Sequence, residues 1–514
     1  TKNVGSKSSR RRKILSTRLR NTDHLSEGAP TNFYQNVEGE TKNMTYHENF
    51  TDALTDPLRI AEEKQKLEEA GVKYIFSCWI DLLGVPKTKP VPISDFEKLC
   101  RGKGPQFAVH SISFVPELGP ADSDQIPLPD LDSIMICPWD KTCAWVFADL
   151  WWEGRPYNLC PRSALRRTVQ NVAEQGYSVY AGVEPEFIVM KWQDGQPVKA
   201  FDNDPMPGQG LRPRRQAFGY DVEYSIDSMG FLGELIDIIE GLGWDLHDVV
   251  AEGAYSQFEL DFHYTDVLRM ADRLVFLRVL LKEVAKRYGM FVTFMPKPTI
   301  GDWRSGAHMN TSMHSLDNPG INLFEAESGG WAEQVYGAVG GLLRHGGALT
   351  AIACSTVNSY NGLVPKVGGF EGGTVTWAPT HMTYGYNNRS AMLRLPQSRF
   401  CIENRAADMC MNPYLSLGMT SAAMTEGVVN CYAPGEPLNQ DLYEMSEEAL
   451  KSSGAQRLPR NLLEAIEILR SDKLARKVLG DSMMESYLRY KMDEWERYHQ
   501  AVTDWEVEEY LRLY

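Results

Sequence analysis

Runs in which apolar and polar residues alternate predict strands in the second part of the chain, and runs with helical spacing predict helices between them. Residues 178–183 form a predicted strand that leads into Glu184, and residues 291–294 form another. Strands that carry acidic residues, with helices outside them, indicate an antiparallel or mixed sheet backed by helices. Helices are predicted for residues 162–175, 225–242, 266–288, 332–353, 412–428 and within 446–514.

The first part of the chain has a different pattern. One charged helix is predicted for residues 58–70, and a small α+β unit follows from the strands around it. Two prolines near Tyr157 mark the boundary, so we predict domains at 57–157 and 158–514. Residues 1–56 have few large aliphatic side chains, and we expect them to be disordered or loosely attached. The predicted strands are 72–80, 88–92, 134–137 and 142–148.

The net charge of −15 hides an asymmetry. The first twenty residues contain eight Lys or Arg and no acid, and subtracting their +8 leaves −23 for the remainder. So acidic a body argues against nucleic-acid binding by the folded part. The basic segment resembles a transit peptide, but a non-native or merely solvated tail explains it equally well.

Cysteine usage and hydropathy bear on the compartment. The nine cysteines are odd in number and contain no CxxC pair, which is typical of reduced, buried thiols. No apolar run reaches the roughly 18 residues that a membrane-spanning helix needs. We therefore predict a cytoplasmic protein that makes no contact with a membrane.

Acidic side chains and one histidine recur beside the predicted strands. Glu184 and Glu186 are two residues apart and share one strand face, where like charges are costly unless a cation neutralises them. A solvated strand face is the alternative for such a pair taken alone. Carboxylate-rich sites suit Mg²⁺ or Mn²⁺. The candidate metal ligands are Glu184, Glu186, Glu252, Glu259, His308 and Glu403.

Three arginines near the last of these acids are candidates for binding phosphate. Arg389, Arg394 and Arg405 match phosphate oxygens because the guanidinium group is a planar fork of donors. Surface ion pairing is the commoner role of any single arginine. No GxxxxGK[ST] or GxGxxG motif follows a predicted strand, which disfavours P-loop and Rossmann nucleotide sites.

In order along the chain, these segments resemble the motifs of the glutamine synthetase superfamily from about residue 70 to 510. They include the ExE strand at Glu184, an element that ends at Glu259 and matches GQxE except for Ser256 in place of the glycine, the FMPKP segment at 294–298, the SGxH element ending at His308, and NRSA at 388–391. The resemblance implies the glutamine synthetase fold, with a small N-terminal β-grasp-like domain and a large catalytic α+β domain. Details near residues 120–124, 148–152 and 376–389 are most similar to its γ-glutamylamide synthetase branch.

The resemblance also implies a role for each candidate residue. Glu186, Glu252 and Glu259 would hold one metal ion, and Glu184, His308 and Glu403 the other. Arg389, Arg394 and Arg405 would neutralise the phosphoryl group during transfer, and Glu371, within a glycine-rich segment, would be the flap acid that takes a proton. Contacts with ATP are expected from Asn310, Ser312, Tyr264 and Arg394.

Departures from the family's motifs fall on the substrate side. Gly362 stands where NSYxR would place an arginine for the α-carboxylate of the amino acid, and Trp303-Arg304 replaces an Asn-Gly pair. Either Arg304 supplies the missing positive charge or the acid is not glutamate. The DGSS motif, whose Asp binds ammonium, is absent, and Glu117 is the only acid in the most similar place. Its loss favours a substituted amine.

The predicted function is therefore an ATP-dependent ligase that joins L-glutamate to an alkyl or aromatic amine through γ-glutamyl phosphate. Glutamine synthetase that uses ammonia is one alternative. A catalytically silent assembly protein on the same scaffold is another, although that reading predicts the loss of metal ligands. The resemblance implies a homo-oligomer, a dodecamer of two hexameric rings with active sites between subunits.

Overall fold

The computed structural model describes residues 56–109, 118–201, 219–299, 303–367 and 374–514. Residues 1–55 of the predicted N-terminal tail, Glu117 and Glu371 lie outside these ranges, so their roles stay predictions.

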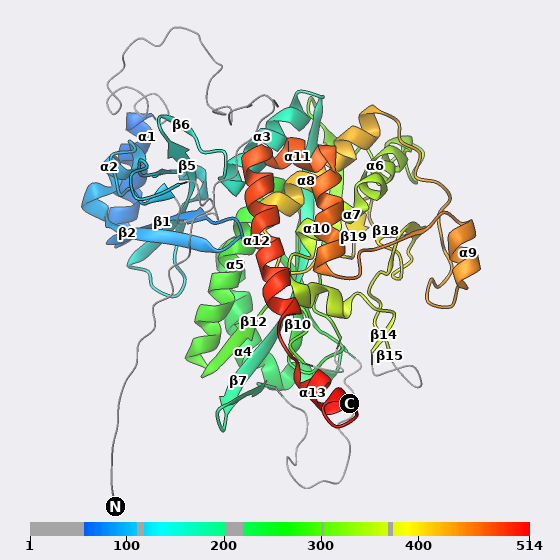
Figure 1. Ribbon diagram of the computed structural model, residues 1–514. Coiled ribbons are helices and arrows are strands. Elements are labelled where there is room, and N and C mark those ends of the chain that lie inside the picture. The colour runs from blue at the N-terminus through cyan, green and yellow to red at the C-terminus, as the bar shows by residue number, and fades with distance from the viewer. Residues whose placement is uncertain (1–55, 110–117, 202–218, 300–302, 368–373) are drawn as a thin grey trace, which may run out of the picture. The chain divides into compact units, whose positions relative to one another are not determined.

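A six-stranded sheet and two helices form the first described part of the chain (Figure 1). Its central strands β1 and β5 are parallel, and β1 pairs antiparallel with β2. Ile60 and Leu67 of α1 pack with Ile75 and Phe96 in a separate small core. The division at residue 157 stays a prediction. The elements are α1 (Pro57–Glu69), β1 (Tyr74–Ile80), β2 (Pro86–Pro92), α2 (Phe96–Cys100), β3 (Ile126–Pro129), β4 (Met135–Ile136), β5 (Cys143–Trp152) and β6 (Arg155–Pro156).

A ten-stranded sheet is the centre of the second part. The long strand β7 lies in its middle, in the order β17-β18-β19-β13-β7-β10-β9, and β8, β11 and β12 also pair with β7. Its pairs are antiparallel except for β17 with β18, which confirms the predicted sheet. The strands are β7 (Tyr177–Gln193), β8 (Gln196–Lys199), β9 (Leu246–Ala251), β10 (Gln257–Phe262), β11 (Thr265–Asp266), β12 (Met290–Thr293), β13 (Ala307–Ser315), β17 (Tyr384–Tyr386), β18 (Leu393–Leu395) and β19 (Ile402–Asn404).

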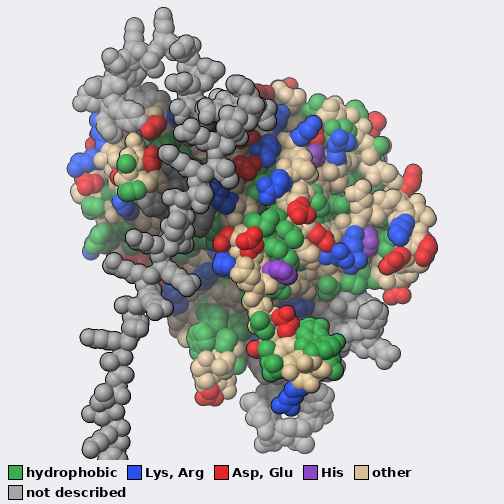
Figure 2. Space-filling view, in the orientation of Figure 1, with side chains coloured by type: hydrophobic (Ala, Val, Ile, Leu, Met, Phe, Trp, Pro, Cys, Tyr) green, Lys and Arg blue, Asp and Glu red, His purple; other side chains and the backbone are tan. Residues whose placement is uncertain are grey.

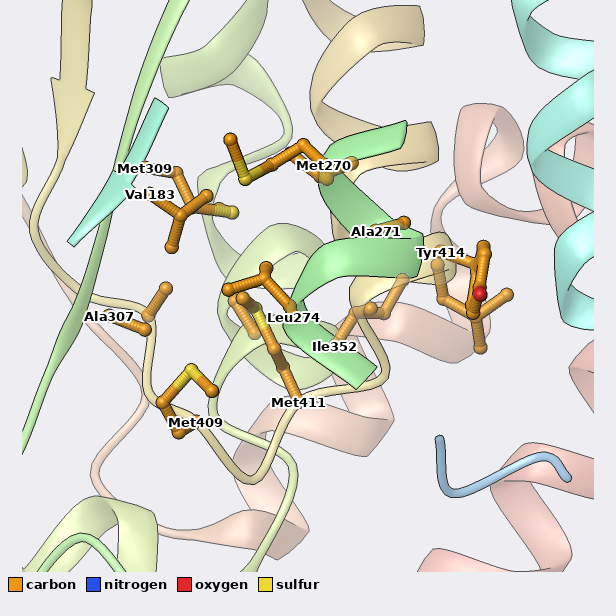
Figure 3. Packing of buried hydrophobic residues seen from close by; sticks show 14 of the residues in the cluster. Val183, Met270, Ala271, Leu274, Ala307, Met309, Ile352, Met409, Met411 and Tyr414 are labelled. Atoms are coloured by element: carbon orange, nitrogen blue, oxygen red, sulfur yellow. The ribbon is translucent and has the colours of Figure 1, made fainter. Parts of the chain in front are cut away.

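Helices cover one face of this sheet. Met270 and Leu274 of α5 face Val183 of β7 and Met309 of β13 in the main core (Figure 3). Since neighbouring residues of a strand point to opposite faces, Glu184 points away from that core. The helices of this part are α3 (Pro161–Ala173), α4 (Val222–Gly241), α5 (Val267–Arg287), α6 (Glu333–Arg344), α7 (Gly346–Ala353), α8 (Pro413–Val429), α9 (Glu447–Ser452), α10 (Leu462–Ser471), α11 (Lys473–Leu479), α12 (Asp481–His499) and α13 (Asp504–Tyr510).

The single helix predicted for residues 332–353 is wrong, because the chain forms two helices that meet at His345. Both ring nitrogens of this buried histidine lie 2.7 Å from carboxylate oxygens, of Asp472 and Glu426. These two partners raise the pKa of His345 despite its burial. The break between α6 and α7 thus coincides with contacts of His345 to residues distant in sequence, and the helical spacing of residues 332–353 gives no sign of it.

Two short antiparallel strand pairs and the C-terminal helices complete the described chain. The pairs are β14 (Lys366–Val367) with β15 (Thr374–Val375), and β16 (His381–Met382) with β20 (Gln456–Arg457). On the face shown in Figure 2, basic side chains lie interspersed with acidic ones. Within the described ranges, none of the helices combines the length and the apolar character needed to cross a membrane.

A buried arginine joins the two predicted domains. Arg162, at the start of α3, is 1 % exposed and pairs with Asp272 of α5 at 2.8 Å. It also pairs with Asp130 at 2.7 Å and Asp149 at 2.9 Å, both from the N-terminal part. A buried cation shared by three carboxylates fixes these elements to one another, since losing the arginine would leave the carboxylates without their buried counter-charge.

Candidate active site

Four neighbouring strands bring the predicted metal ligands together. The register places His308 of β13 opposite Glu184 of β7, and Glu259 of β10 opposite Glu186 of β7. Glu403 of β19 lies opposite Asn310, two residues beyond His308. Side chains at these positions share the sheet face that α5 leaves uncovered. The sheet therefore collects acids that lie 219 residues apart in the sequence, from 184 to 403.

The imidazole of His308 lies at the centre of this cluster. Its Nδ1 is 3.2 Å from Glu184 Oε2 and 3.9 Å from Glu259 Oε2, and its Nε2 is 3.8 Å from Glu186 Oε1. Ligand atoms of Glu184, His308 and Glu403 lie within 4.8 Å of one another, and so do those of Glu186, Glu259 and His308. Each set offers oxygen and imidazole donors, which suit Mg²⁺ or Mn²⁺.

Glu252 lines the same cavity as these ligands, but it belongs to no such three-residue set among the described residues. A third set instead joins Glu184 and Glu259 to Asp261. Asp261 is therefore a site residue that the candidate ligands omitted. Its position two residues after Glu259, on an alternating strand, was the signal that would have included it.

Burial and mutual repulsion hold protons on several of these carboxylates. Burial, followed by the charge of Glu186, raises the pKa of Glu252 to about 7. Burial and the charge of Glu184 raise the pKa of Asp261 to about 8, and the pKa of Glu259 is also raised well above its usual range. A divalent cation would replace these protons, because it favours the ionised form of every ligand.

Glu403 has the opposite electrostatics. Its burial alone would raise its pKa, but the nearby charges of Arg405, His308 and Arg394 lower the pKa to about 2. Arg394 Nη1 donates to Glu403 Oε2 at 2.6 Å, and Arg405 Nη1 donates to Glu403 Oε1. Two of the three predicted phosphate-binding arginines thus bracket a predicted metal ligand.

Arg389, the third, has no carboxylate partner in the part of the chain that the structure describes. Its guanidinium lies 5.8 Å from the centre of the Trp377 ring, and it lines the cavity with Arg394 and Arg405. Burial and the charges of those two arginines lower the pKa of Arg389. A cation held beside two others, without an acid of its own, is suited to an incoming anion.

Arg399 is a second residue that sequence reasoning missed. Its Nη2 donates to Glu184 Oε1 at 2.8 Å and to Asn310 Oδ1 at 3.0 Å, and it lines the cavity. It is not among the candidate residues predicted from the sequence. Strand pairing, which spacing along the chain does not show, brings it to the site.

Three of the four residues expected to contact ATP lie outside the cavity lining. Asn310 Nδ2 donates to Glu184 Oε1 at 2.8 Å, which places it beside the metal ligands. Ser312 is buried, and its hydroxyl lies 3.0 Å from His314 Nε2. Tyr264 is exposed and packs edge-on against Tyr180. Contacts of these residues with ATP stay a prediction.

Predicted substrate residues lie in the same cavity, whose volume is about 530 Å³. Trp303 and Arg304 both line it. Gly362 is packed against the Arg304 side chain. Trp377 and Tyr220 add two more aromatic rings to the lining. The cavity therefore joins an acidic floor and an arginine cluster to a wall with three aromatic side chains.

Comparison with known proteins agrees with this arrangement. The protein family described as "Glutamine synthetase, catalytic domain" matches residues 158–510 of this chain. The glutamate–methylamine ligase of Methyloversatilis universalis is 33% identical over 460 residues, covering 88% of this chain and 99% of that protein. The glutamine synthetase of Rhizobium meliloti is 34% identical over 443 residues, covering 85% and 96% of the two chains.

A solved structure described as a GmaS–ADP complex superimposes with a TM-score of 0.77 at 32% identity, covering 87% of this chain and 99% of the other. An unliganded GmaS structure gives a TM-score of 0.75 at 31% identity, covering 89% of this chain and 100% of the other. Fold and sequence therefore agree over most of the chain. The protein belongs to the glutamine synthetase family and is an ADP-forming C–N ligase.

Proposed function

We propose that this protein joins L-glutamate to an organic amine at the expense of ATP. The observation that carries the proposal is the pair of three-residue ligand sets sharing His308, placed beside an arginine cluster in one cavity. Such an arrangement suits phosphoryl transfer, in which positioning and charge neutralisation supply most of the catalysis.

The reaction follows from these groups. An oxygen of the substrate's γ-carboxylate attacks the γ-phosphorus of ATP, and ADP leaves. The amine nitrogen then attacks the carbonyl carbon of the resulting acyl phosphate, and phosphate leaves with the oxygen that came from glutamate. When bound, two divalent cations would neutralise the acidic floor and polarise the transferring phosphoryl group.

The protein's own residues position and neutralise the reactants. Glu186 and Glu259, with Glu252 nearby, would hold one cation, and Glu184, His308 and Glu403 the other. Arg389 faces the transferring phosphoryl group, while Arg394 and Arg405 fix Glu403. Removal of the amine proton is assigned to Glu371, as the family resemblance implies.

An organic amine is favoured over ammonia by the cavity wall. Trp303, Trp377 and Tyr220 line it, and aromatic surface stabilises an alkyl or aryl group by apolar contact or cation–π attraction. The similarity to a glutamate–methylamine ligase supports the same choice. Similarity to glutamine synthetases at nearly equal identity keeps ammonia as the rival substrate.

Assembly into a ring of subunits, two hexamers forming a dodecamer, is part of the same proposal. The support is the family resemblance together with exposed apolar side chains around the C-terminal helix α13 (Figure 2). Trp505, Leu511 and Leu513 are each more than 60 % exposed, and a group of such residues is typical of a surface that another protein covers.

The test is ADP release with ATP, Mg²⁺ and L-glutamate across ammonia, methylamine, longer alkylamines, a polyamine and aniline. We expect kcat/KM for at least one organic amine to exceed that for ammonia by about 100-fold or more, because contacts with the substituent stabilise only the larger substrate. A Trp303→Ala variant should narrow this ratio. A higher kcat/KM for ammonia than for every organic amine would instead identify a glutamine synthetase.

A further inference from the structure

Arg304 holds a buried guanidinium group in the cavity wall. Its side chain is 4 % exposed, and its Nη2 donates to Asp408 Oδ2 at 2.9 Å and to the carbonyl oxygen of Ala406 at 2.7 Å. Its Nε is buried and has no acceptor among the described residues. Because buried N–H groups nearly always have a partner, this donor requires an explanation.

Gly362 is explained by Arg304. Its backbone is outside the positive-φ region, so no conformational need for glycine exists there. A Cβ at this position would lie 2.5 Å from both Cβ and Cδ of Arg304, closer than any side chain tolerates. The absence of a side chain at 362 makes the space that the Arg304 methylene groups fill.

The residue before Arg304 depends on a glycine in the same way. A Cβ at Gly253 would lie 1.9 Å from the Trp303 indole ring. Two glycines from separate segments therefore accommodate two large consecutive side chains, Trp303 and Arg304, and both side chains line the cavity. This wall is built around a specific cation and a specific aromatic ring.

Three of the other cavity arginines are paired with acids of the candidate metal site. Arg394 and Arg405 bind Glu403, and Arg399 binds Glu184. Arg389 has no acid partner among the described residues, but it lies over the Trp377 ring beside Arg394 and Arg405, where the proposed function places the transferring phosphoryl group. Glutamate has two carboxylates, and in the proposed reaction only the γ-carboxylate reacts near the metal ligands. The other carboxylate loses its water on binding and needs a hydrogen-bond donor from the protein in its place.

We propose that Arg304 binds the second, non-reacting carboxylate of the acid substrate through its guanidinium group, whose Nε–H has no partner among the described residues, with Asp408 fixing the guanidinium orientation. The proposal rests on the proposed function and names Arg304 as the residue that selects a dicarboxylic amino acid. Gly362 contributes because its lack of a side chain leaves room for Arg304 to extend along the cavity.

The first test is Arg304→Lys, which keeps a cation for Asp408 but removes the Nε–H. We expect KM for glutamate to rise by about 10- to 100-fold, the worth of one hydrogen bond to a charged group, with KM for ATP unchanged. Activity with 4-aminobutyrate, which is glutamate without its α-carboxylate, should change little. The preference for glutamate over 4-aminobutyrate therefore falls, an effect that a merely structural residue would not produce.

The second test moves the arginine from position 304 to position 362. Gly362→Ala alone should lower the Tm because of its overlap with Arg304, whereas the same change in an Arg304→Gly background should lower it much less. The double variant Arg304→Gly/Gly362→Arg should recover part of the glutamate preference that Arg304→Gly loses.

An unchanged preference for glutamate in folded Arg304→Lys would overturn the proposal. Failure of the proposed function is separable, because glutamate binding is also measured without turnover. If the native protein releases no ADP with any amine, thermal stabilisation by glutamate but not by 4-aminobutyrate, lost in Arg304→Lys, would still support the Arg304 assignment. Equal stabilisation by both compounds would refute it.

Discussion

Replacing Arg389 with alanine should lower kcat by about a thousand-fold while the Tm stays the same or rises. Removing an arginine that neutralises a phosphoryl group in flight has cost about 10³–10⁵ in related chemistry. The fold should lose little, because Arg389 is exposed, has no carboxylate partner within the described ranges and lies beside two other arginines. Loss of activity and retained stability are measured on the same preparation, by ADP release and thermal unfolding.

Arg497→Ala is the matched control for this result. Arg497 is also exposed, and it pairs with Asp493 on α12 at 2.9 Å, outside the cavity lining. Its removal should leave kcat within about two-fold of the native value, because surface ion pairs contribute little. An Arg389→Ala enzyme that keeps more than about a tenth of native kcat would show that this arginine does not neutralise the transferring group.

Glu259→Gln is expected to abolish the response to metal while making the metal-free protein more stable. Glu259 is 8 % exposed, and burial and the neighbouring acids raise its pKa well above its usual range. At neutral pH, folding of the metal-free chain must therefore place either a proton on this acid or a charge beside the others, a cost that glutamine avoids. Mg²⁺ or Mn²⁺ should raise the Tm of the native protein and leave that of the variant nearly unchanged. ADP release should fall by about a thousand-fold or more, because one ligand of a catalytic cation is lost.

The same carboxylates give the metal response a pH dependence. Raised pKa values mean that the folded protein binds more protons than the unfolded chain, so metal-free stability should fall as pH rises from about 4 to about 8. This window follows from Glu252, with a pKa of about 7, and Asp261, with a pKa of about 8. Stabilisation by Mg²⁺ should therefore be larger at pH 8 than at pH 6.

For the Glu259→Gln variant, a rise in Tm on adding Mg²⁺ or Mn²⁺ that equals the rise in the native protein would exclude Glu259 as a metal ligand.

Spacing along single strands was enough to predict part of the site. Glu184 and Glu186 share a strand face because side chains alternate, and the same rule applied to Glu259 would have added Asp261. The register between neighbouring strands could not be predicted from the sequence. The pairing of His308 with Glu184 depends on the packing of whole strands, and so does the approach of Arg399 to Glu184.

Contacts between distant segments account for the other differences. Both Gly362 and Arg304 stood out as departures from the family's motifs, but their contact across the intervening chain was visible only in the fold. The break at His345 similarly involves Glu426 and Asp472, which lie on or next to other helices. Periodicity reports which face of a helix is buried, and carries no information on such partners.

The path of one oxygen atom tests the proposed chemistry most directly. With L-glutamate labelled with ¹⁸O in its γ-carboxylate, ATP, Mg²⁺ and the preferred amine, mass spectrometry of the released phosphate should find one ¹⁸O for each amide formed. That oxygen attacks the γ-phosphorus and leaves with it when the amine displaces phosphate. Amide formed together with unlabelled phosphate would contradict a γ-glutamyl phosphate intermediate, and with it the account of this cavity as a site of phosphoryl transfer to glutamate.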